Sequence, residues 1–284
     1  MTAPATELLS SVAPLAPRYD AWICDVWGVM HNGVDAFPGA AEACRRFRER
    51  GGTVLLLSNA PRPAPAVQAQ LDRFGVPRDA YDSILTSGDL TRKLISEKRD
   101  QRLFHLGPER DKPIFEGLDL RFSTPEEADL VVCSGLYNDE VDTPADYKDL
   151  LEPLARRGVP MICANPDLVV ERGSRIVYCA GSLAAEYERL GGSVTYAGKP
   201  HRPIYDLAFE RLDELRNGPV PRERILAIGD GVKTDIRGAA VAGIDSAFIA
   251  SAIHVTGDLD PATIEQLFKE CGSRPVAALP ALAW

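Results

Sequence analysis

The sequence lacks the cysteine spacing of a metal knuckle or a dense disulfide framework. Its six cysteines are scattered, and none of them belongs to a Cys-x-x-Cys pair. Most lie in apolar runs, where a free thiol behaves as a small hydrophobic side chain. A reducing cytoplasm is therefore the compartment that we expect.

Positive charge, long apolar runs and aromatic residues are also scarce. The 32 lysines and arginines are outnumbered by 41 acidic residues, which leaves a net charge of −9, and this sign repels nucleic-acid phosphates and anionic lipid. No uncharged apolar stretch reaches the roughly 18 residues of a membrane-spanning helix, and residues 1–17 lack the regions of a signal peptide. Aromatic residues make up 7% of the chain and are scattered, so no stacking platform for nucleobases is indicated. We expect a small-molecule substrate rather than nucleic acid or a membrane.

What the chain does contain is a regular alternation of short apolar runs with amphipathic stretches. At about 150 residues per domain, its 284 residues predict two domains, or one large domain with an insertion. The strand-like runs are 21–26, 53–58, 130–135, 159–164, 225–230 and 244–250. The helical stretches are 38–50, 63–74, 144–157, 202–216 and 261–270. Because several strand-like runs are apolar throughout, the alternation predicts an α/β fold with a parallel sheet.

Polar residues stand at the ends of the first two predicted strands. Asp25 follows the first apolar run, at the edge where open parallel sheets bind ligands, so it is a candidate nucleophile or metal ligand unless it only caps the next turn. Ser58 and Asn59 follow the second run, where a helix begins. They are suited to hydrogen-bonding an anion or to an ordinary N-cap. Arg62 adds a fixed positive charge nearby.

Two later segments carry charged residues of the same kind. Lys199 stands just before a proline and a predicted helix, where it is either a solvated charge or a clamp that neutralises phosphate and carboxylate together. Asp230 and Asp235 flank a glycine-containing loop after the run 225–230. Carboxylates in this arrangement suit Mg²⁺, which is usually held by one or two carboxylates and substrate phosphate.

Taken together, these motifs resemble those of the haloacid dehalogenase superfamily. The segments are DVWGV (25–29), SNAPR (58–62), GKP (198–200) and GDGVKTDIRGA (229–239), in this order. Within the superfamily the chain is similar to the class IIA hydrolases, the group of the nucleotide and pyridoxal-phosphate phosphatases. VMHNG (29–33), TSGDLTRKL (86–94) and ANPDLVVERG (164–173) extend the match, which covers about residues 20–250.

The resemblance implies a fold and a domain organisation. Family members have a Rossmann-like parallel-sheet core and a mobile α/β cap, here of the C2 type, inserted between the second and third motifs. In this chain the core would comprise 1–87 and 196–284, and the cap would comprise 88–195. A core with an inserted second domain also agrees with the estimate from length.

The resemblance also implies catalytic and metal-binding roles. Asp25 would attack phosphorus, form an aspartyl-phosphate and ligate Mg²⁺ together with Asp230 and the backbone carbonyl of Trp27. Asp235 would orient the direct ligands of the metal from behind. Lys199 would pair with both the nucleophile and the phosphate.

Substrate binding is expected from the segment after the second strand. The resemblance implies that Ser58 binds the phosphoryl oxygens, and the residue types of Asn59 and Arg62 suit the same anion, as does Lys199. Such a site needs mainly positioning and charge neutralisation for phosphoryl transfer. The expected substrate is a small phosphorylated metabolite of the sugar- or nucleotide-phosphate type.

Trp27 departs from the family pattern. Phosphatases of the family usually carry at this position a second Asp, which protonates the leaving group, and an indole N–H has no useful acidity. Such a group typically raises the reaction rate 10²–10⁴-fold, so a phosphatase with Trp27 is expected to be slow. It would be faster if its substrate had an easy leaving group, or if another residue, such as His31 or His201, supplied the proton. Two other functions stay open, a haloacid-type dehalogenase, which needs no proton for halide departure, and a catalytically impaired protein that binds a phosphometabolite.

Two further segments have weaker signals. Asn165 and Asp167, in ANPD, are expected either where the cap meets the site or in an ordinary turn. The closing apolar segment 276–284 is expected to dock on the core or on a second copy of the chain, as in a homodimer.

Overall fold

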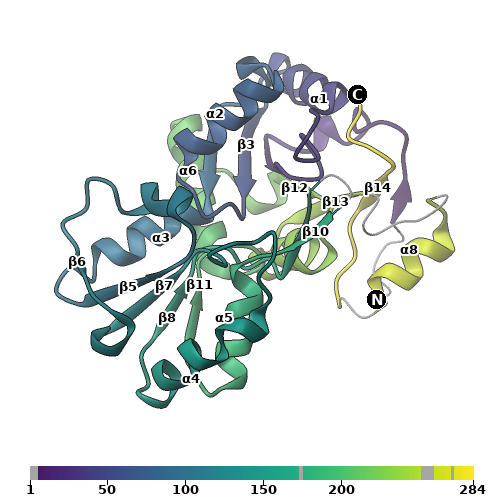
Figure 1. The fold of residues 1–284 in the computed structure, drawn as a ribbon. Helices are drawn as coiled ribbons and strands as arrows, with labels where there is room; N and C mark the ends of the chain where they lie inside the picture. Colours follow the sequence, from purple (N-terminus) through teal and green to yellow (C-terminus); the bar gives the residue numbers. More distant parts are fainter. Residues whose placement is uncertain (1–5, 173–174, 251–258, 270–271) are drawn as a thin grey trace. The chain divides into compact units, whose positions relative to one another are not determined.

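The computed structural model describes residues 6–172, 175–250, 259–269 and 272–284 (Figure 1). The chain divides into two compact units. The first, here called the core unit, comprises Met1–Ser58, Gln68–Leu85 and Lys199–Trp284. The second, here called the inserted unit, comprises Asn59–Val67 and Thr86–Gly198.

The core unit is built on a seven-stranded sheet. In spatial order its strands are β1 (Glu7–Leu8), β14 (Ala277–Leu279), β13 (Asp245–Ile249), β12 (Ile225–Gly229), β2 (Ala21–Asp25), β3 (Thr53–Ser58) and β4 (Ser83–Thr86). The strands from β1 to β3 in this order pair in parallel. Every residue of β2, β3 and β12 is buried, because strands covered on both faces have no solvent side and their sequences are apolar throughout.

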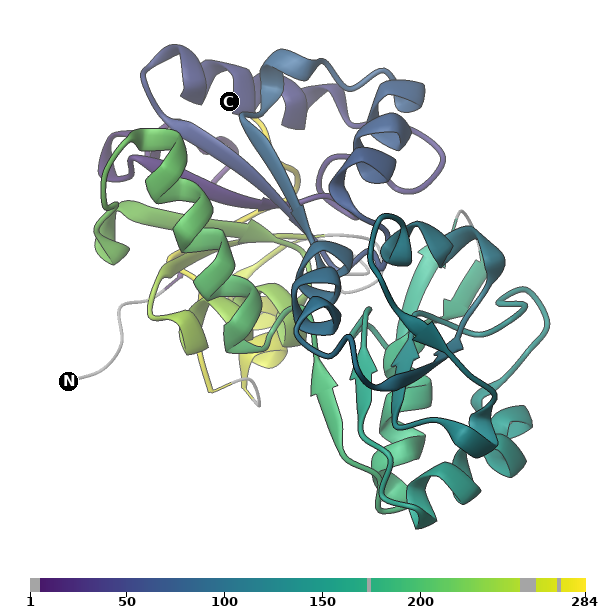
Figure 2. The same ribbon diagram turned by 90° about the vertical axis from the view of Figure 1, so that its left-hand side faces the viewer.

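Helices cover both faces of this sheet. The α-helices of the unit are α1 (Pro38–Glu49), α6 (Arg202–Arg216), α7 (Arg237–Ala242) and α8 (Pro261–Phe268). Helix α2 (Ala64–Phe74) has its first turn in the inserted unit and its remainder in the core unit. Figure 2 shows the strands between α1, in purple-blue, and α6, in green. Helix α1 begins at a proline and is followed by Gly51 with φ 84°, the asymmetry by which the sequence marks the two ends of a helix.

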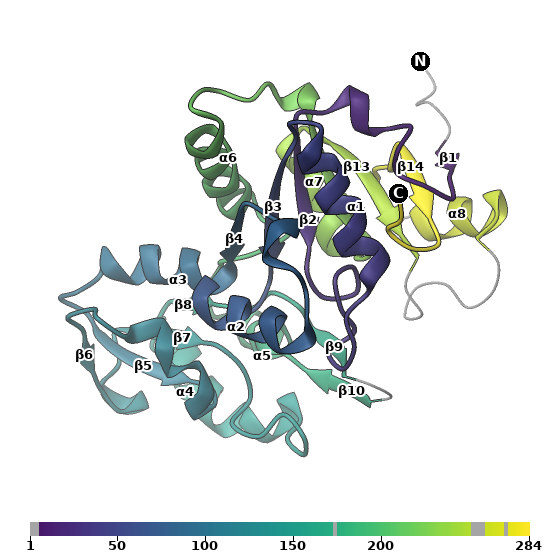
Figure 3. The same cartoon turned by 90° about the horizontal axis from the view of Figure 1, so that it is seen from above.

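The inserted unit has a five-stranded parallel sheet of its own. Its order is β11 (Val194–Tyr196), β8 (Met161–Cys163), β7 (Leu130–Cys133), β5 (Arg102–Leu106) and β6 (Arg121–Phe122). The helices are α3 (Ser87–Ser96), α4 (Lys148–Arg156) and α5 (Ala180–Arg189). Buried side chains of β5, β7 and β8 pack with those of α4 and α5 into one hydrophobic core. The strands β9 (Val169–Arg172) and β10 (Arg175–Tyr178) form a separate antiparallel hairpin (Figure 3).

Short helical turns connect these elements. They are the 3₁₀ turns η1 (Ala16–Arg18), η2 (Arg78–Ala80), η3 (Glu109–Phe115), η4 (Pro125–Glu127), η5 (Pro144–Tyr147) and η6 (Arg222–Arg224), and the π-helical turn η7 (Val232–Ile236). None of the helices in the described ranges is both long and apolar enough to cross a membrane.

The predicted fold class is confirmed, since a parallel-sheet α/β core receives a second α/β unit. Several element bounds were wrong. The helix expected over 144–157 begins with the 3₁₀ turn η5, and the strand expected over 159–164 is limited to Met161–Cys163. Residue 270, the expected end of the last helix, lies outside the described residues.

The closing segment contributes β14 to the core sheet. The core and cap boundaries given above stay a prediction, and the inserted unit also includes 59–67.

Candidate active site

Three neighbouring strands of the core unit end in polar residues. Asp25 is the last residue of β2 and Ser58 is the last residue of β3, while Asp230 directly follows β12. The chain leaves β2 toward β3 and leaves β12 toward β13, in opposite directions along the sheet. The carboxyl edge between β2 and β12 is therefore the topological switch point, where open α/β sheets bind their ligands.

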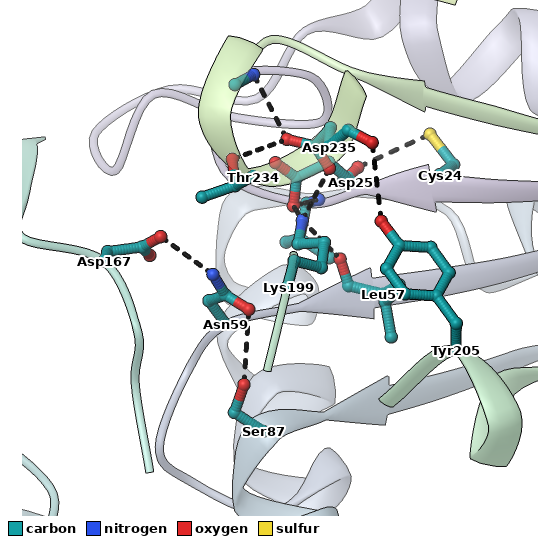
Figure 4. Close-up of polar contacts among 12 residues, drawn as sticks. Cys24, Asp25, Leu57, Asn59, Ser87, Asp167, Lys199, Tyr205, Thr234 and Asp235 are labelled. Carbon is teal, nitrogen blue, oxygen red and sulfur yellow. Dashed lines mark hydrogen bonds and ion pairs between the residues drawn. The ribbon is translucent and has the colours of Figure 1, made fainter. Parts of the chain in front are cut away.

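Lys199 brings a buried ammonium group to this edge (Figure 4). Its Nζ lies 2.7 Å from Oδ1 of Asp25 and 2.8 Å from Oδ1 of Asp235, and it donates a hydrogen bond of 3.1 Å to the carbonyl of Leu57. The side chain of Lys199 is only 3% exposed. Burial lowers its pKa, but the carboxylates of Asp235 and Asp25 outweigh this effect and hold the pKa well above its usual value. The ammonium is therefore charged.

Three buried carboxylates converge at the same place. Asp25, Asp230 and Asp235 each offer an oxygen, and these oxygens lie within 4.8 Å of one another. The ammonium group of Lys199 offsets one of the three negative charges. Burial raises the pKa of Asp25 well above its usual range, and the charges of Asp235 and Asp230 raise it further, against the lowering effect of Lys199. A cation bound between the carboxylates would relieve the repulsion and the burial cost that raise this pKa, and would favour the ionised form of Asp25.

The donor set and the local backbone fit a hard divalent cation. Carboxylate oxygens are the ligands that Mg²⁺ prefers. Gly28, in the loop after β2, has φ +83°, and a Cβ at this position would lie 2.1 Å from Oδ2 of Asp230. Only glycine lets the loop adopt this conformation and approach the carboxylate so closely.

The two carboxylates that pair with Lys199 differ in their bonding. Oδ1 of Asp25 accepts a 2.7 Å hydrogen bond from the N–H of Val26 and faces Lys199. Both oxygens of Asp235 accept hydrogen bonds, Oδ1 from Lys199 and Oδ2 from the N–H of Gly231 and the hydroxyl of Thr234. A carboxylate held through both oxygens by protein donors is suited to support the loop 230–235 rather than to move.

The loop after Asp25 places an aromatic cluster next to the site. The rings of Trp27 and His31 meet edge to face with centroids 5.1 Å apart, and His31 also contacts Phe74. The N–H of Gly33 donates to Nδ1 of His31. Burial lowers the pKa of His31 to about 4, so this histidine is neutral near pH 7 and is a poor proton donor. His201 is the N-cap residue of α6, and its proposed acid role stays a prediction.

Two of the predicted substrate-binding residues lie in the inserted unit. The side-chain amide of Asn59 donates a 2.8 Å hydrogen bond to Oδ1 of Asp167. Burial raises the pKa of Asp111, and the charge of Arg62 offsets part of this rise. The structure thus brings Asp25, Asp230, Asp235 and Lys199 into one cluster, while Asn59 and Arg62 have partners in the inserted unit.

The ANPD motif has a partner that its sequence does not indicate. A turn was one of the two expectations for this motif, and Oδ1 of Asn165 does accept a hydrogen bond from the N–H of Asp167. No local pattern indicates that Asp167 also binds Asn59, 108 residues earlier in the chain.

Comparison with known proteins assigns both halves of the chain to one kind of protein. The family model described as haloacid dehalogenase-like hydrolase matches residues 22–121. A second model, described as HAD-hydrolase-like, matches residues 196–268.

Individual relatives agree with these matches. The chain is 26% identical to the 5′-nucleotidase YutF of Bacillus subtilis, over 86% of this chain and 94% of that protein. It is 27% identical to the ribonucleotide monophosphatase NagD of Escherichia coli K12, over 84% and 90%. A crystal structure of a haloacid dehalogenase-like hydrolase from Brucella suis is 49% identical, with a TM-score of 0.87, and the match covers 97% of this chain and 100% of that one.

Proposed function

Because the chain belongs to the haloacid dehalogenase-like hydrolase family, we propose that it is a magnesium-dependent phosphohydrolase acting on a small phosphorylated metabolite. The observation that carries the proposal is the buried cluster of Asp25, Asp230, Asp235 and Lys199 at the switch point of the core sheet. The two relatives named above are both nucleotide phosphatases, and another relative, from Staphylococcus epidermidis, is an acid sugar phosphatase. These names support a substrate of the sugar- or nucleotide-phosphate type.

The proposed reaction has two steps. In the first, a carboxylate oxygen of Asp25 attacks phosphorus, the bond from phosphorus to the leaving oxygen breaks, and that oxygen departs with the electron pair. In the second, water attacks phosphorus, the bond from phosphorus to the Asp25 oxygen breaks, and phosphate leaves with the Asp25 carboxylate restored. Over the two steps, one proton of the attacking water ends on the oxygen of the leaving group. Asp25 fits the nucleophile because its Oδ1 is oriented by the N–H of Val26 and by Lys199.

The other residues would supply binding and charge. Lys199 neutralises negative charge at the nucleophile and at the phosphoryl group, and Ser58, at the end of β3, donates a hydrogen bond to a phosphoryl oxygen. Asp25, Asp230 and the backbone carbonyl of Trp27 would hold Mg²⁺, with Asp235 behind them. The ion supplies additional charge neutralisation for the transferring phosphoryl group.

The dehalogenase and binding-protein alternatives have weaker support. Cleavage of a carbon–halogen bond has no use for a cluster of three carboxylates that fits a divalent cation. A protein that only binds phosphate has no physical reason to retain several buried carboxylates close together, since their mutual repulsion is costly.

A panel of phosphorylated metabolites, assayed with Mg²⁺ and with EDTA, tests the proposal. We expect phosphate release that requires Mg²⁺ and is lost in EDTA. Halide release from 2-chloropropionate without metal would instead identify a dehalogenase, and substrate binding without turnover would identify a binding protein. Either outcome would overturn the proposal.

Replacement of Trp27 by Asp is expected to raise the turnover of an alkyl phosphate, because it introduces the missing acid–base group. Such a group is typically worth on the order of 10²-fold or more. Initial rates of phosphate release measure the effect, and Trp27→Asn, which adds a polar side chain without an acidic proton, is the matched control. A folded Trp27→Asp variant with an unchanged or lower rate would count against this account of position 27.

A further inference from the structure

Asn59 lies where the chain passes from one unit to the other. The chain makes this passage four times, after Ser58, after Val67, after Leu85 and after Gly198. Asn59 is the first residue after Ser58, Ser87 is the second residue after Leu85, and Gly198 is the last residue before Lys199. Within the inserted unit, Ser87 and Gly198 lie against the side-chain amide of Asn59.

The amide of Asn59 is held at both ends (Figure 4). Its Nδ2 donates to Oδ1 of Asp167 at 2.8 Å, and its Oδ1 accepts from the hydroxyl of Ser87 at 3.3 Å. Asn59 is 5% exposed and Ser87 is fully buried. Breaking either bond would remove a hydrogen-bond partner from a buried polar group, which is costly. The two partners together fix the orientation of the amide.

Asp167 is itself held firmly. Its N–H donates to Oδ1 of the buried Asn165, and its carbonyl accepts from the N–H of Gly181 in the first turn of α5. The backbone of Asp167 is therefore anchored both by the ANPD turn and by a helix. It presents a fixed acceptor to Asn59.

Gly198 packs directly against this network. A Cβ at position 198 would lie 2.2 Å from Oγ of Ser87 and 2.5 Å from Oδ1 of Asn59. The close approach requires glycine, because any side chain would displace the two hydrogen-bonded groups. The backbone just before Lys199 is thereby tied to the backbone just after Ser58.

We propose that Asp167 is a positioning residue, which acts through Asn59 to fix the two chain segments that carry Ser58 and Lys199. Ser58 is one peptide bond from Asn59, and Lys199 is one peptide bond from Gly198. A displacement of about 1 Å at a reacting group can cost on the order of 10²-fold in rate. The side-chain amide of Asn59 then serves Asp167 and Ser87 rather than the phosphoryl group, which revises the predicted substrate-binding role of that side chain. The kinetic part of this inference rests on the proposed phosphohydrolase function.

An exchange of the two side chains separates positioning from substrate binding. Asn59→Asp places two carboxylates against each other, and we expect kcat to fall on the order of 10²-fold. Asp167→Asn keeps an oxygen that can accept from Asn59, so its effect should be small. In the double variant Asn59→Asp/Asp167→Asn, the new amide donates to the new carboxylate, which still accepts from Ser87. We expect kcat to recover to within a few-fold of wild type, with KM little changed.

The opposite result has a clear meaning. If the amide of Asn59 donates to the phosphoryl group, a carboxylate at position 59 repels the substrate whatever stands at 167. The double variant would then be as impaired as Asn59→Asp, and the inference would be overturned.

Hydrogen exchange gives a second readout that needs no activity. We expect faster amide exchange in segments 57–60 and 196–200 of Asn59→Asp, and wild-type exchange in the double variant. Unchanged exchange in Asn59→Asp would contradict the positioning role. If wild type and Asp25→Asn release phosphate equally, the proposed function fails, and the exchange experiment still decides the inference.

Discussion

Replacement of Asp25 by Asn lowers the kcat of phosphate release by on the order of 10³-fold or more, the scale expected when a nucleophile is removed. An amide has the shape of the carboxylate but lacks the charge and the basic oxygen that attack phosphorus. Burial and the charges of Asp235 and Asp230 raise the pKa of Asp25, so its ionised form destabilises the fold, and the neutral amide should leave the folded protein no less stable. Steady-state kinetics and thermal unfolding on the same preparation measure both effects.

Asp206→Asn is the matched control for this variant. Asp206 lies on α6 of the same unit and forms an exposed pair with Arg202, and exposed pairs contribute little to stability. The control should therefore keep wild-type kinetics. Comparable rates for Asp25→Asn and Asp206→Asn would show that Asp25 is not the nucleophile.

Replacement of Lys199 by Met has the second large effect, on stability as well as on activity. The ammonium group lies 2.7 Å from Asp25 and 2.8 Å from Asp235, and the Lys199 side chain is 3% exposed. Removing one partner of a buried ion pair leaves an uncompensated buried charge, which typically costs about 3–5 kcal/mol. Urea unfolding without metal should show a loss of this size in the free energy of unfolding.

Added Mg²⁺ and a surface variant serve as internal checks. Mg²⁺ should restore part of the stability of Lys199→Met, because it neutralises the same carboxylates and binds the folded state. Lys269→Met, at the exposed end of α8, should unfold like wild type. A Lys199→Met variant as stable as Lys269→Met would mean that the three carboxylates are not held charged and close together.

Much of the core unit could be predicted from local sequence. The buried strands β2, β3 and β12 are apolar throughout and end at polar residues, so both their positions and the location of the site at their carboxyl ends follow from general rules. The pairing of Lys199 with Asp25 does not follow from such rules. It was expected only from the resemblance to a family, since 174 residues separate the two in the chain.

The inserted unit was harder to predict for identifiable reasons. β5 reads RLFHL and begins and nearly ends with polar residues, β6 has two residues, and β11 has three partly or fully exposed ones. Such strands are specified by their neighbours in the sheet rather than by their own pattern. The Asn59–Asp167 hydrogen bond could not be predicted from local sequence either, because it joins two segments 108 positions apart that only the folded chain brings together.

The central claim is that the Asp25 carboxylate forms a covalent bond to phosphorus, and mass spectrometry of acid-quenched enzyme tests it directly. During turnover with Mg²⁺, the peptide that contains Asp25 should gain one phosphoryl group. The adduct should accumulate in wild type and less in Trp27→Asp, where the new carboxylate can activate water for its hydrolysis. Phosphate release by wild type with no modified Asp25 peptide at any quench time would contradict the account.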